Sequence, residues 1–402
     1  MRDEYFHGQQ RFTVHSEAGQ GLLAKAHANK TRIMCPCRKP MPEMYVAAVG
    51  DRFIVKRMPE TGLDHTPDCP SFEPPEELSG LGPMRRGAID EDPDAGVITL
   101  KLGFPLKQYG KRKAPPEIDG KPATEAKTKP QQMSLTALLH YLWHESRLGT
   151  WYPNMEGKRN WHVISNALRW TAADVSAKGL DLRDILYIPS FYDPKRKPEL
   201  ASARNAMFNR LSATPGSGTQ LGILIGEYKS HEATPMGAKL KVKHAPDCAF
   251  LMDQDLAKRF NNVFEEKLML ASTLDMCHVM VISTFSIAKA GYPILQDVAM
   301  MLTGPTWIPF EHLRELEVLT KLILEGRAFQ KSLRFTLAAD AQISSAVLLD
   351  TPEPYALFVT ETPHDANEVS GLLGVIATTP LNHWLWVDEN AMDAFPQKGY
   401  RR

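Results

Sequence analysis

The stretches TRIMCPCRKP (residues 31–40) and GLDHTPDCPSF (residues 62–72) decide how the N-terminal part of the chain is expected to fold. The first stretch carries two thiols on either side of one proline, and the second carries an imidazole and a thiol three residues apart. Thiolate and imidazole are common protein ligands of Zn²⁺, which prefers four of them in a tetrahedron. The pattern therefore predicts a zinc site. Its four ligands are Cys35, Cys37, His65 and Cys69.

The sequence between the two ligand pairs supports a small zinc module. Residues 43–58 (EMYVAAVGDRFIVKRM) contain two β-prone runs around Gly50-Asp51, which predicts a hairpin. Three thiolates and one imidazole leave no open coordination position, so the predicted role of the metal is structural. Two alternatives stay open. The cysteines can be a chance cluster of small buried side chains, or Cys35 and Cys37 can be a redox pair, although the βαβ context of a thioredoxin is missing.

Bulk composition limits the class of protein. With 402 residues the chain exceeds one ordinary core, and 47 basic residues balance 47 acidic ones, so a nucleic-acid site would have to be a local patch. The charged N-terminus predicts no secretory signal, and the longest apolar stretch, residues 278–288, is far shorter than the roughly 20 residues of a membrane helix. Five dispersed cysteines do not resemble a disulfide framework. We expect a protein of the reducing cytoplasm with no membrane segment.

The predicted fold class is α+β, with four segments along the chain. Residues 1–78 form the zinc-bound hairpin module, and residues 79–132 are expected to be an irregular linker rich in Pro, Gly and charge. Residues 133–220 are predicted to be helical and rich in tryptophan, with Ser134 and Asn160 as helix N-caps. Residues 221–402 are predicted to be a mixed α/β domain.

The order of elements near the C-terminus also resembles the core of a nuclease superfold. We predict a helix over residues 310–326, then three strands, a helix over 365–378 and a final strand. The strands lack the acidic residues that such a nuclease needs, so this likeness, if present, is to a degenerate and inactive form.

One stretch suggests catalysis. In ILIGEYKS (residues 223–230) a strand ends in Glu227-x-Lys229, half of the nuclease pattern in which acidic residues hold Mg²⁺ and a lysine orients water. The two side chains would share one face of a regular strand. Asp193 is available as the missing acid, although nothing marks it as a ligand. The alternative is an exposed strand with alternating charges.

Three short basic patches are candidates for binding nucleic acid, and the alternative for each is an ordinary solvated surface. The balanced net charge counts against tight binding. The candidate residues are Arg85 and Arg86, Lys111, Arg112 and Lys113, and Lys195, Arg196 and Lys197.

Several phrases together resemble one uncharacterised bacterial family, the domain of unknown function numbered 1173. They include CPC, FIVKRMPETGLDHTPDCPSFEPPEEL, LLHYLWHESRLGTWYPNMEGKRNW and WLWVDE, and they span most of the chain. The family is noted for three N-terminal cysteines, which correspond to Cys35, Cys37 and Cys69. The resemblance implies a setting on plasmids and integrative conjugative elements. It implies no reaction, because the family has no established activity.

The sequence leads to two readings of function. The first is a non-catalytic, zinc-stabilised accessory protein of a bacterial mobile element that binds nucleic acid or a partner protein. The second is a Mg²⁺-dependent nuclease that uses Glu227 and Lys229. A purely structural hub for other proteins fits the composition equally well, and the sequence predicts no oligomeric state.

Overall fold

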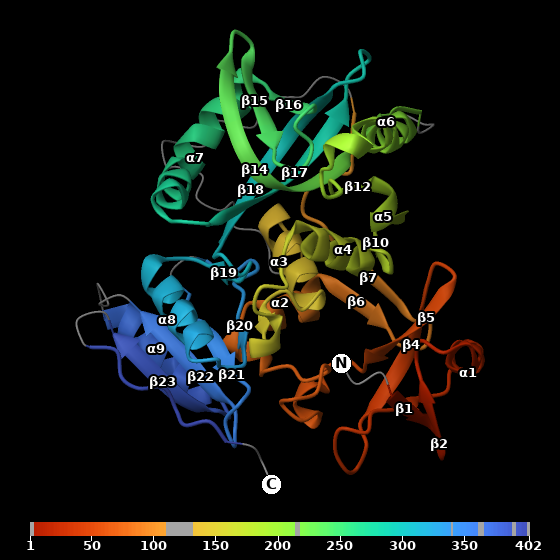
Figure 1. The fold of residues 1–402 in the computed structure, drawn as a ribbon, viewed down its shortest axis with the longest axis vertical. Helices are drawn as coiled ribbons and strands as arrows, with labels where there is room; N and C mark the ends of the chain where they lie inside the picture. The colour runs from red at the N-terminus through yellow and green to blue at the C-terminus, as the bar shows by residue number, and fades with distance from the viewer. Residues whose placement is uncertain are drawn as a thin grey trace.

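The computed structural model describes residues 4–109, 132–213, 218–338, 341–360, 366–387 and 391–399. Figure 1 shows an N-terminal sheet in red and orange, a barrel in green and teal, and a C-terminal sheet in blue, with helices between them. The predicted mixture of helices and sheets is confirmed. Among the described residues, every helix is too short or too polar to span a bilayer.

The N-terminal sheet contains the predicted hairpin. Strands β4 and β5 pair in antiparallel register from Met44–Arg57 to Val49–Arg52, and Gly50 in the turn has a φ of +61°. Helix α1 (Glu17–Ala28) packs on these strands and is capped by Ser16. The sheet order is β2-β1-β3-β4-β5, with bounds Gln10–Thr13, Glu4–His7, Ile33–Met34, Glu43–Val49 and Arg52–Arg57.

The segment predicted to be an irregular linker is ordered where it is described. Helix α2 (Leu81–Gly87) is followed by strands β6 (Ile89–Asp92) and β7 (Val97–Leu100). These strands form a second sheet because β7 pairs with β10 (Val175–Ala177), which lies far away in sequence. The prediction of an irregular segment from residue 79 is therefore wrong up to residue 109. The Pro and charge content of residues 79–109 does not indicate that β7 pairs with β10.

Both predicted helices of the central segment are present. Helix α3 (Leu135–Glu145) begins at Ser134, whose hydroxyl accepts a hydrogen bond from the Ala137 amide at 3.1 Å. Helix α4 (Trp161–Ala172) begins in the same way at Asn160. Three further elements lead towards the barrel: α5 (Leu182–Ile185), β12 (Leu186–Tyr187) and α6 (Lys197–Ala213).

Five strands then close into a barrel. Strand β14 pairs with β17 over its first half and with β15 over its second half, β15 pairs with β16, β16 runs parallel to β18, and β18 pairs with β17. The ring is thus β14-β15-β16-β18-β17, with helix α7 between β16 and β17. This connectivity is that of an OB-fold barrel. The bounds are Gly222–Thr234 for β14, Gly237–Val242 for β15, Ala249–Met252 for β16, Gln254–Thr273 for α7, His278–Ile287 for β17 and Pro293–Thr303 for β18.

A bulge in β14 lets one strand serve both neighbours. The register shifts between Tyr228 and Ser230, which inserts Lys229 as an extra residue. A bulge bends a strand and raises its twist, as barrel closure requires. Just before the bulge the chains lie close, since a Cβ on Gly226 would lie only 3.0 Å from Val242 Cγ1. The bulge also breaks the alternation of faces on which the Glu227-x-Lys229 prediction depended.

The C-terminal part has the predicted order of elements. Helix α8 (Leu313–Leu324) precedes strands β20 (Phe329–Lys331), β21 (Ala346–Leu348) and β22 (Tyr355–Thr360), followed by α9 (Ala366–Thr378) and β23 (Asn382–Val387). The sheet order is β23-β22-β21-β20-β9, where β9 is Thr150–Trp151. Element order does not test the nuclease likeness, which stays a prediction. Residues 221–402, expected to be one domain, contribute to two separate sheets.

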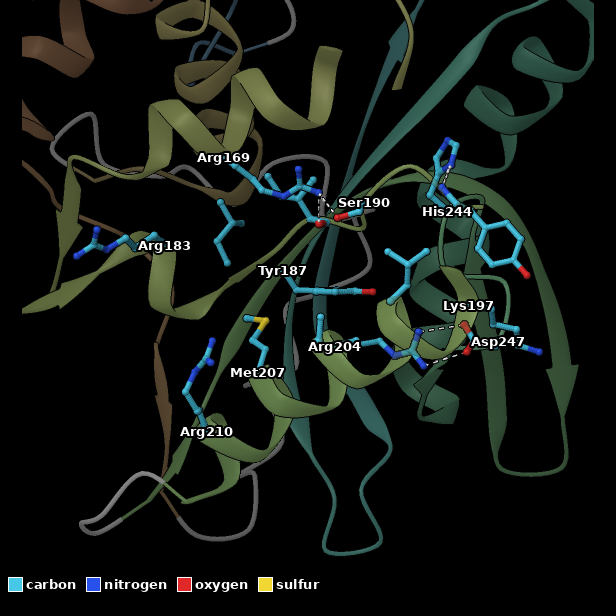
Figure 2. A pocket seen from close by; sticks show the side chains of 15 residues that line it. Arg169, Arg183, Tyr187, Ser190, Lys197, Arg204, Met207, Arg210, His244 and Asp247 are labelled. Atoms are coloured by element: carbon cyan, nitrogen blue, oxygen red, sulfur yellow. Dashed lines mark hydrogen bonds and ion pairs between the residues drawn. The ribbon is translucent and has the colours of Figure 1, made fainter. Parts of the chain in front are cut away.

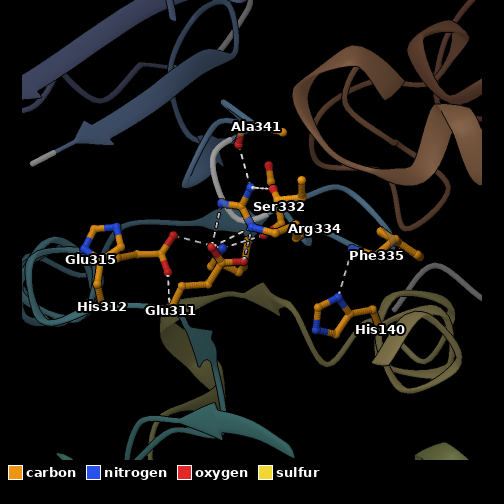
Figure 3. Close-up of polar contacts among 10 residues, drawn as sticks. His140, Glu311, His312, Glu315, Ser332, Arg334, Phe335 and Ala341 are labelled. Carbon is orange, nitrogen blue, oxygen red and sulfur yellow. Dashed lines mark hydrogen bonds and ion pairs between the residues drawn. The ribbon is translucent and has the colours of Figure 1, made fainter. Parts of the chain in front are cut away.

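Polar contacts order the segment around Arg334, and one of them joins it to helix α3 (Figure 3). Glu315 of α8 pairs with Lys331 of β20 at 3.0 Å, and both side chains are buried. Arg334 pairs with Glu311 at 2.7 Å, and the Phe335 amide donates to Nδ1 of His140 on helix α3 at 3.0 Å. Burial raises the pKa of Glu311, but the hydrogen bond from Arg334 and the nearby cations outweigh it and lower that pKa to about 2.

A buried carboxylate, Glu73, is one of the groups that attach the N-terminal module to the rest of the chain. Its oxygens lie 2.6 Å from Arg57 Nη2 on β5, 2.7 Å from Arg85 Nη2 on α2 and 2.6 Å from His144 Nε2 on α3. Burial alone would raise the pKa of Glu73. The charge of Arg57, the hydrogen bond with His144 and the charge of Arg85 outweigh burial and hold that pKa below its ordinary range. One side chain therefore ties three elements together.

Replacing this carboxylate should destabilise the protein strongly. In Glu73→Gln two largely buried guanidinium groups lose their counter-charge, and we expect a loss of about 3 kcal/mol at pH 7 in urea unfolding. Because the pKa of Glu73 is lowered from 4.5, its stabilisation is present above that value and is lost as the pH falls below it. The difference from the parent protein should therefore shrink between pH 7 and pH 3.

A matched control is Glu76→Gln. Glu76 pairs with Arg86, whose side chain is 64% exposed. An exposed pair contributes less than about 1 kcal/mol. Equal losses for the two variants would contradict the role given to Glu73.

Candidate metal centre

The two predicted ligand pairs lie on turns that face each other beside the hairpin. Cys35 and Cys37 follow strand β3, and the Cys35 amide donates to the Pro42 carbonyl at 2.8 Å. His65 follows a short 3₁₀ turn (Gly62–Asp64), and the Cys69 amide donates to the Thr66 carbonyl at 2.8 Å. Backbone hydrogen bonds therefore fix both turns. The four ligand side chains are positioned before any metal binds.

The ligand atoms have the spacing that a tetrahedral metal site needs. One candidate atom from each of Cys35, Cys37, His65 and Cys69 lies within 4.8 Å of all the others. The Cys35 and Cys69 sulfurs are 3.7 Å apart, and Nδ1 of His65 lies 3.3 Å from the Cys37 sulfur and 3.5 Å from the Cys69 sulfur. Two thiolates bound to zinc at about 2.3 Å would be separated by about 3.8 Å. The cluster can therefore hold a metal ion, and the donor set suits zinc.

The histidine presents one particular nitrogen to the sulfurs. Nδ1 of His65 makes the contacts with Cys37 and Cys69, whereas its Nε2 is buried without a hydrogen-bond partner within the part of the chain that the structure describes. Nδ1 is therefore the nitrogen available to a metal. His65, Cys35 and Cys69 are buried, which protects bound metal from water and chelators.

The thiols influence one another through the same contacts. A hydrogen bond with the Cys35 thiol lowers the pKa of Cys69 to about 4, and the same bond raises the pKa of Cys35. Burial raises the pKa of Cys37. Since a metal binds thiolates, ion binding must displace the remaining protons.

The alternatives from the sequence can be compared with this geometry. The thiols do pack in a small core with Leu23 and Ile33, as the chance-cluster reading expects. That reading does not explain why an imidazole nitrogen meets two sulfurs. The redox reading pairs Cys35 with Cys37, and it does not account for the contact between the Cys35 and Cys69 sulfurs. Cys248 is buried away from the cluster, in the main core.

The three predicted basic patches differ in burial and in the residues that they contact. Arg85 is largely buried and paired with Glu73, so the prediction that it contacts nucleic acid is not supported. Arg86 is exposed and paired with Glu76. Residues Lys111, Arg112 and Lys113 lie outside the described residues.

The third basic patch lies at the start of helix α6. Lys195 is exposed there, Arg196 pairs with Glu199 at 2.5 Å, and Lys197 lines a cavity. The Asp193 side chain accepts a hydrogen bond from the Lys195 amide, so it caps the turn.

The proposed catalytic pair is not brought together. Glu227 is only 3% exposed and pairs with Lys243 Nζ at 2.5 Å and His278 Nδ1 at 2.7 Å. Burial raises the pKa of Glu227, but the bonds to His278 and Lys243 outweigh it and lower that pKa. Lys229 is exposed on the bulge.

The sequence reasoning missed a row of lysines on β15. In GAKLKVKH (residues 237–244) Lys239, Lys241 and Lys243 alternate with buried Leu240 and Val242, so they face outwards from the barrel. The alternation of lysine and apolar residues is visible in the sequence. That the lysines share the outer face of a barrel is not, because the sequence did not indicate a barrel.

The metal centre makes a direct prediction. Purified protein should contain about one zinc ion per chain by elemental analysis, and Cys69→Ser should lose most of it because a ligand is removed. Cys248→Ser is the matched control and should keep its metal. Equal metal content in all three proteins, or none in the parent, would contradict the site.

Comparison with known proteins identifies the family of the chain. Neither the curated proteins nor the solved structures give a match to the chain. A family model described as "Protein of unknown function (DUF1173)" matches residues 5–389, nearly the whole chain. The resemblance carried by the cysteine region and the tryptophan-rich segment is therefore confirmed, and the chain belongs to the DUF1173 family.

Proposed function

We propose that this protein binds single-stranded nucleic acid on the outer face of its barrel, formed by β14, β15 and β16. The observation that carries the proposal is the OB-fold connectivity combined with a row of outward lysines. In OB-fold barrels the second and third strands and two neighbouring loops form the surface that binds oligonucleotides. Here those strands are β15 and β16.

The charge of this face suits a phosphate backbone. Lys239 and Lys241 project from β15, Lys243 follows the last residue of that strand and pairs with Glu227, and exposed Lys229 lies on the neighbouring strand β14. The acid beside them, Glu232, pairs with Lys239 at 2.8 Å and Lys241 at 3.0 Å. Hydrogen bonds from these two lysines lower the pKa of Glu232 to about 2. These four lysines outnumber Glu232 and Glu227, the two carboxylates that pair with them, so the face keeps a positive charge in a protein with no net charge.

Two loops supply apolar surface next to this charge. Met236 in the turn between β14 and β15 is 80% exposed, and Tyr292 between β17 and β18 is 44% exposed. Both hairpins project from the same end of the barrel, at the top of Figure 1. Aromatic side chains beside a basic groove stack with bases whatever their sequence. Binding without strong sequence preference is the expected mode.

The metal centre has a supporting role in this proposal. A donor set of three thiolates and one imidazole supports zinc as the ion that this site would bind. With four protein ligands it has no free position for a substrate, so it holds the N-terminal module in shape.

The cellular setting is part of the same proposal. The resemblance to proteins of plasmids and conjugative elements supports an accessory role in the maintenance of such an element, in the cytoplasm. A partner protein that uses the same barrel face would be the alternative ligand. The nuclease hypothesis is not favoured, because Glu227 is already paired with Lys243 and His278.

The barrel face can be tested with a labelled dT12 oligonucleotide and fluorescence anisotropy at 50 to 300 mM salt. The double variant Lys239→Ala/Lys241→Ala should bind about tenfold more weakly than the parent, and its salt dependence should be shallower by about 1.4 units of slope. The reason is the loss of two phosphate contacts.

The matched control removes two exposed lysines from helix α7, in the double variant Lys258→Ala/Lys267→Ala. It has the same net charge as the test variant and should bind like the parent. An equal loss in both variants would indicate nonspecific electrostatics. No binding by the parent at low salt would refute the proposed function.

A further inference from the structure

Beside the barrel lie two adjoining cavities lined by cationic side chains. The first has a volume of about 200 Å³ and is bounded by α4, α5, β12, α6 and the loop after β15 (Figure 2). Asp247 is the single carboxylate among the described residues that line it. The second has a volume of about 380 Å³ and shares Arg169, Ser190 and Tyr192 with the first. The cations that line the first cavity are Arg169, Arg183, Lys197, Arg204 and Arg210.

Arg169 is the strongest indication of an anionic ligand. Its guanidinium donates to the Ile188 carbonyl at 2.8 Å, to the Asn166 side-chain oxygen at 2.9 Å and to the Ser190 hydroxyl at 3.2 Å, all of which are neutral. Over the described ranges, no carboxylate lies within ion-pair distance of it. Burial lowers the pKa of Arg169. A partly buried cation without a counter-charge is unfavourable, and a bound anion would compensate it.

The acid in the first cavity does not neutralise it. Both oxygens of Asp247 are taken by Arg204, whose nitrogens lie 3.0 and 3.1 Å away in a two-bond pair. This pair fixes one wall of the cavity, as the dashed lines in Figure 2 show. Arg183 also has an acidic partner, since it lies 3.6 Å from Asp181, but Arg169 and Lys197 add positive charge for which the described lining has no further carboxylate. Arginine and lysine side chains that line a small cavity are suited to binding a phosphate group.

The second cavity offers a surface for a planar ring. Phe191 lines it and is 49% exposed, next to Arg196 and His162. An exposed phenylalanine at the mouth of a cationic cavity gives a base a face on which to stack. A phosphate and a base in neighbouring cavities together make a nucleotide.

The cavities are continuous with the barrel face along the chain. His244 lines the first cavity and directly follows Lys243, the last lysine of the β15 row. Its ring is fixed by stacking on Trp161, with centroids 5.1 Å apart, and by a hydrogen bond from the Tyr192 amide at 3.3 Å. A strand lying on the face would thus bring its end to the cavity.

We propose that the two cavities bind a nucleotide with a terminal phosphate, with the phosphate in the first cavity beside Arg169 and the base against Phe191. The same chemistry is offered by the 5′-phosphorylated end of a single strand and by a free nucleoside monophosphate. Binding of a 5′-phosphorylated strand end rests on the proposed function, because it requires that the protein binds single strands. Binding of a free nucleoside monophosphate does not depend on it.

The test compares two dT8 oligonucleotides labelled at the 3′ end, one with a 5′-phosphate and one with a 5′-hydroxyl, with adenosine monophosphate as competitor. The parent protein should bind the 5′-phosphorylated strand about tenfold more tightly, as expected for a charge-assisted contact to arginine. Arg169→Gln should remove this preference. Because Arg169 also holds the Ile188 carbonyl, Lys197→Ala serves as a second variant at an exposed site and should reduce the preference.

Two controls separate the cavity from the barrel face. Arg259→Ala removes a cation from helix α7, outside both cavities, and should keep the full preference. The Lys239→Ala/Lys241→Ala variant should bind both strands more weakly but still prefer the phosphorylated one.

The outcomes also distinguish this proposal from the proposed function. If the parent binds both strands equally and millimolar adenosine monophosphate does not compete, the cavity proposal is overturned while the barrel proposal stands. If the preference survives in both Arg169→Gln and Lys197→Ala, the cavity proposal is also overturned. Binding of adenosine monophosphate that Arg169→Gln abolishes, with no binding of either strand, would support the cavity as a free-nucleotide site and refute the proposed function.

Discussion

The rest of the structure depends on one strand, β14, which forms backbone hydrogen bonds with two different partners. Its first half completes the ladder of β17 and its second half that of β15, so the sheet has closed on itself. Closure removes the exposed edges that would otherwise invite aggregation. It also fixes which side chains point outwards. The bulge at Lys229 makes closure possible, and it separates that lysine from the buried Glu227.

The metal ligands stabilise a different part of the molecule from the one proposed to bind nucleic acid. The turn that carries His65 and Cys69 leads within a few residues to Glu73, the carboxylate that contacts α2 and α3. A bound ion would therefore fix the position of the chain that anchors the N-terminal module. This arrangement explains how a metal with no open coordination position can still matter for the whole protein.

The sequence predicted those features of the structure that depend on neighbouring residues. The hairpin around Gly50, the caps at Ser134 and Asn160 and the four clustered ligands all follow from neighbouring residues, and the structure contains each of them. Features made by distant segments could not be predicted in this way. Strand β7 pairs with Val175, which is far away in sequence, and the cationic cavity combines residues from four elements and the loops after β12 and β15. Arg85 was misjudged for the same reason, since its partner Glu73 becomes visible only after folding.

The central claim is that single-stranded nucleic acid lies across β14 and β15 of the barrel. The most direct measurement is photo-crosslinking of a single strand containing 5-iodouracil, followed by identification of the modified peptides by mass spectrometry. The account predicts crosslinks near Met236 and Tyr292, the exposed side chains of the two barrel loops. Crosslinks confined to the N-terminal module around the metal ligands would contradict it.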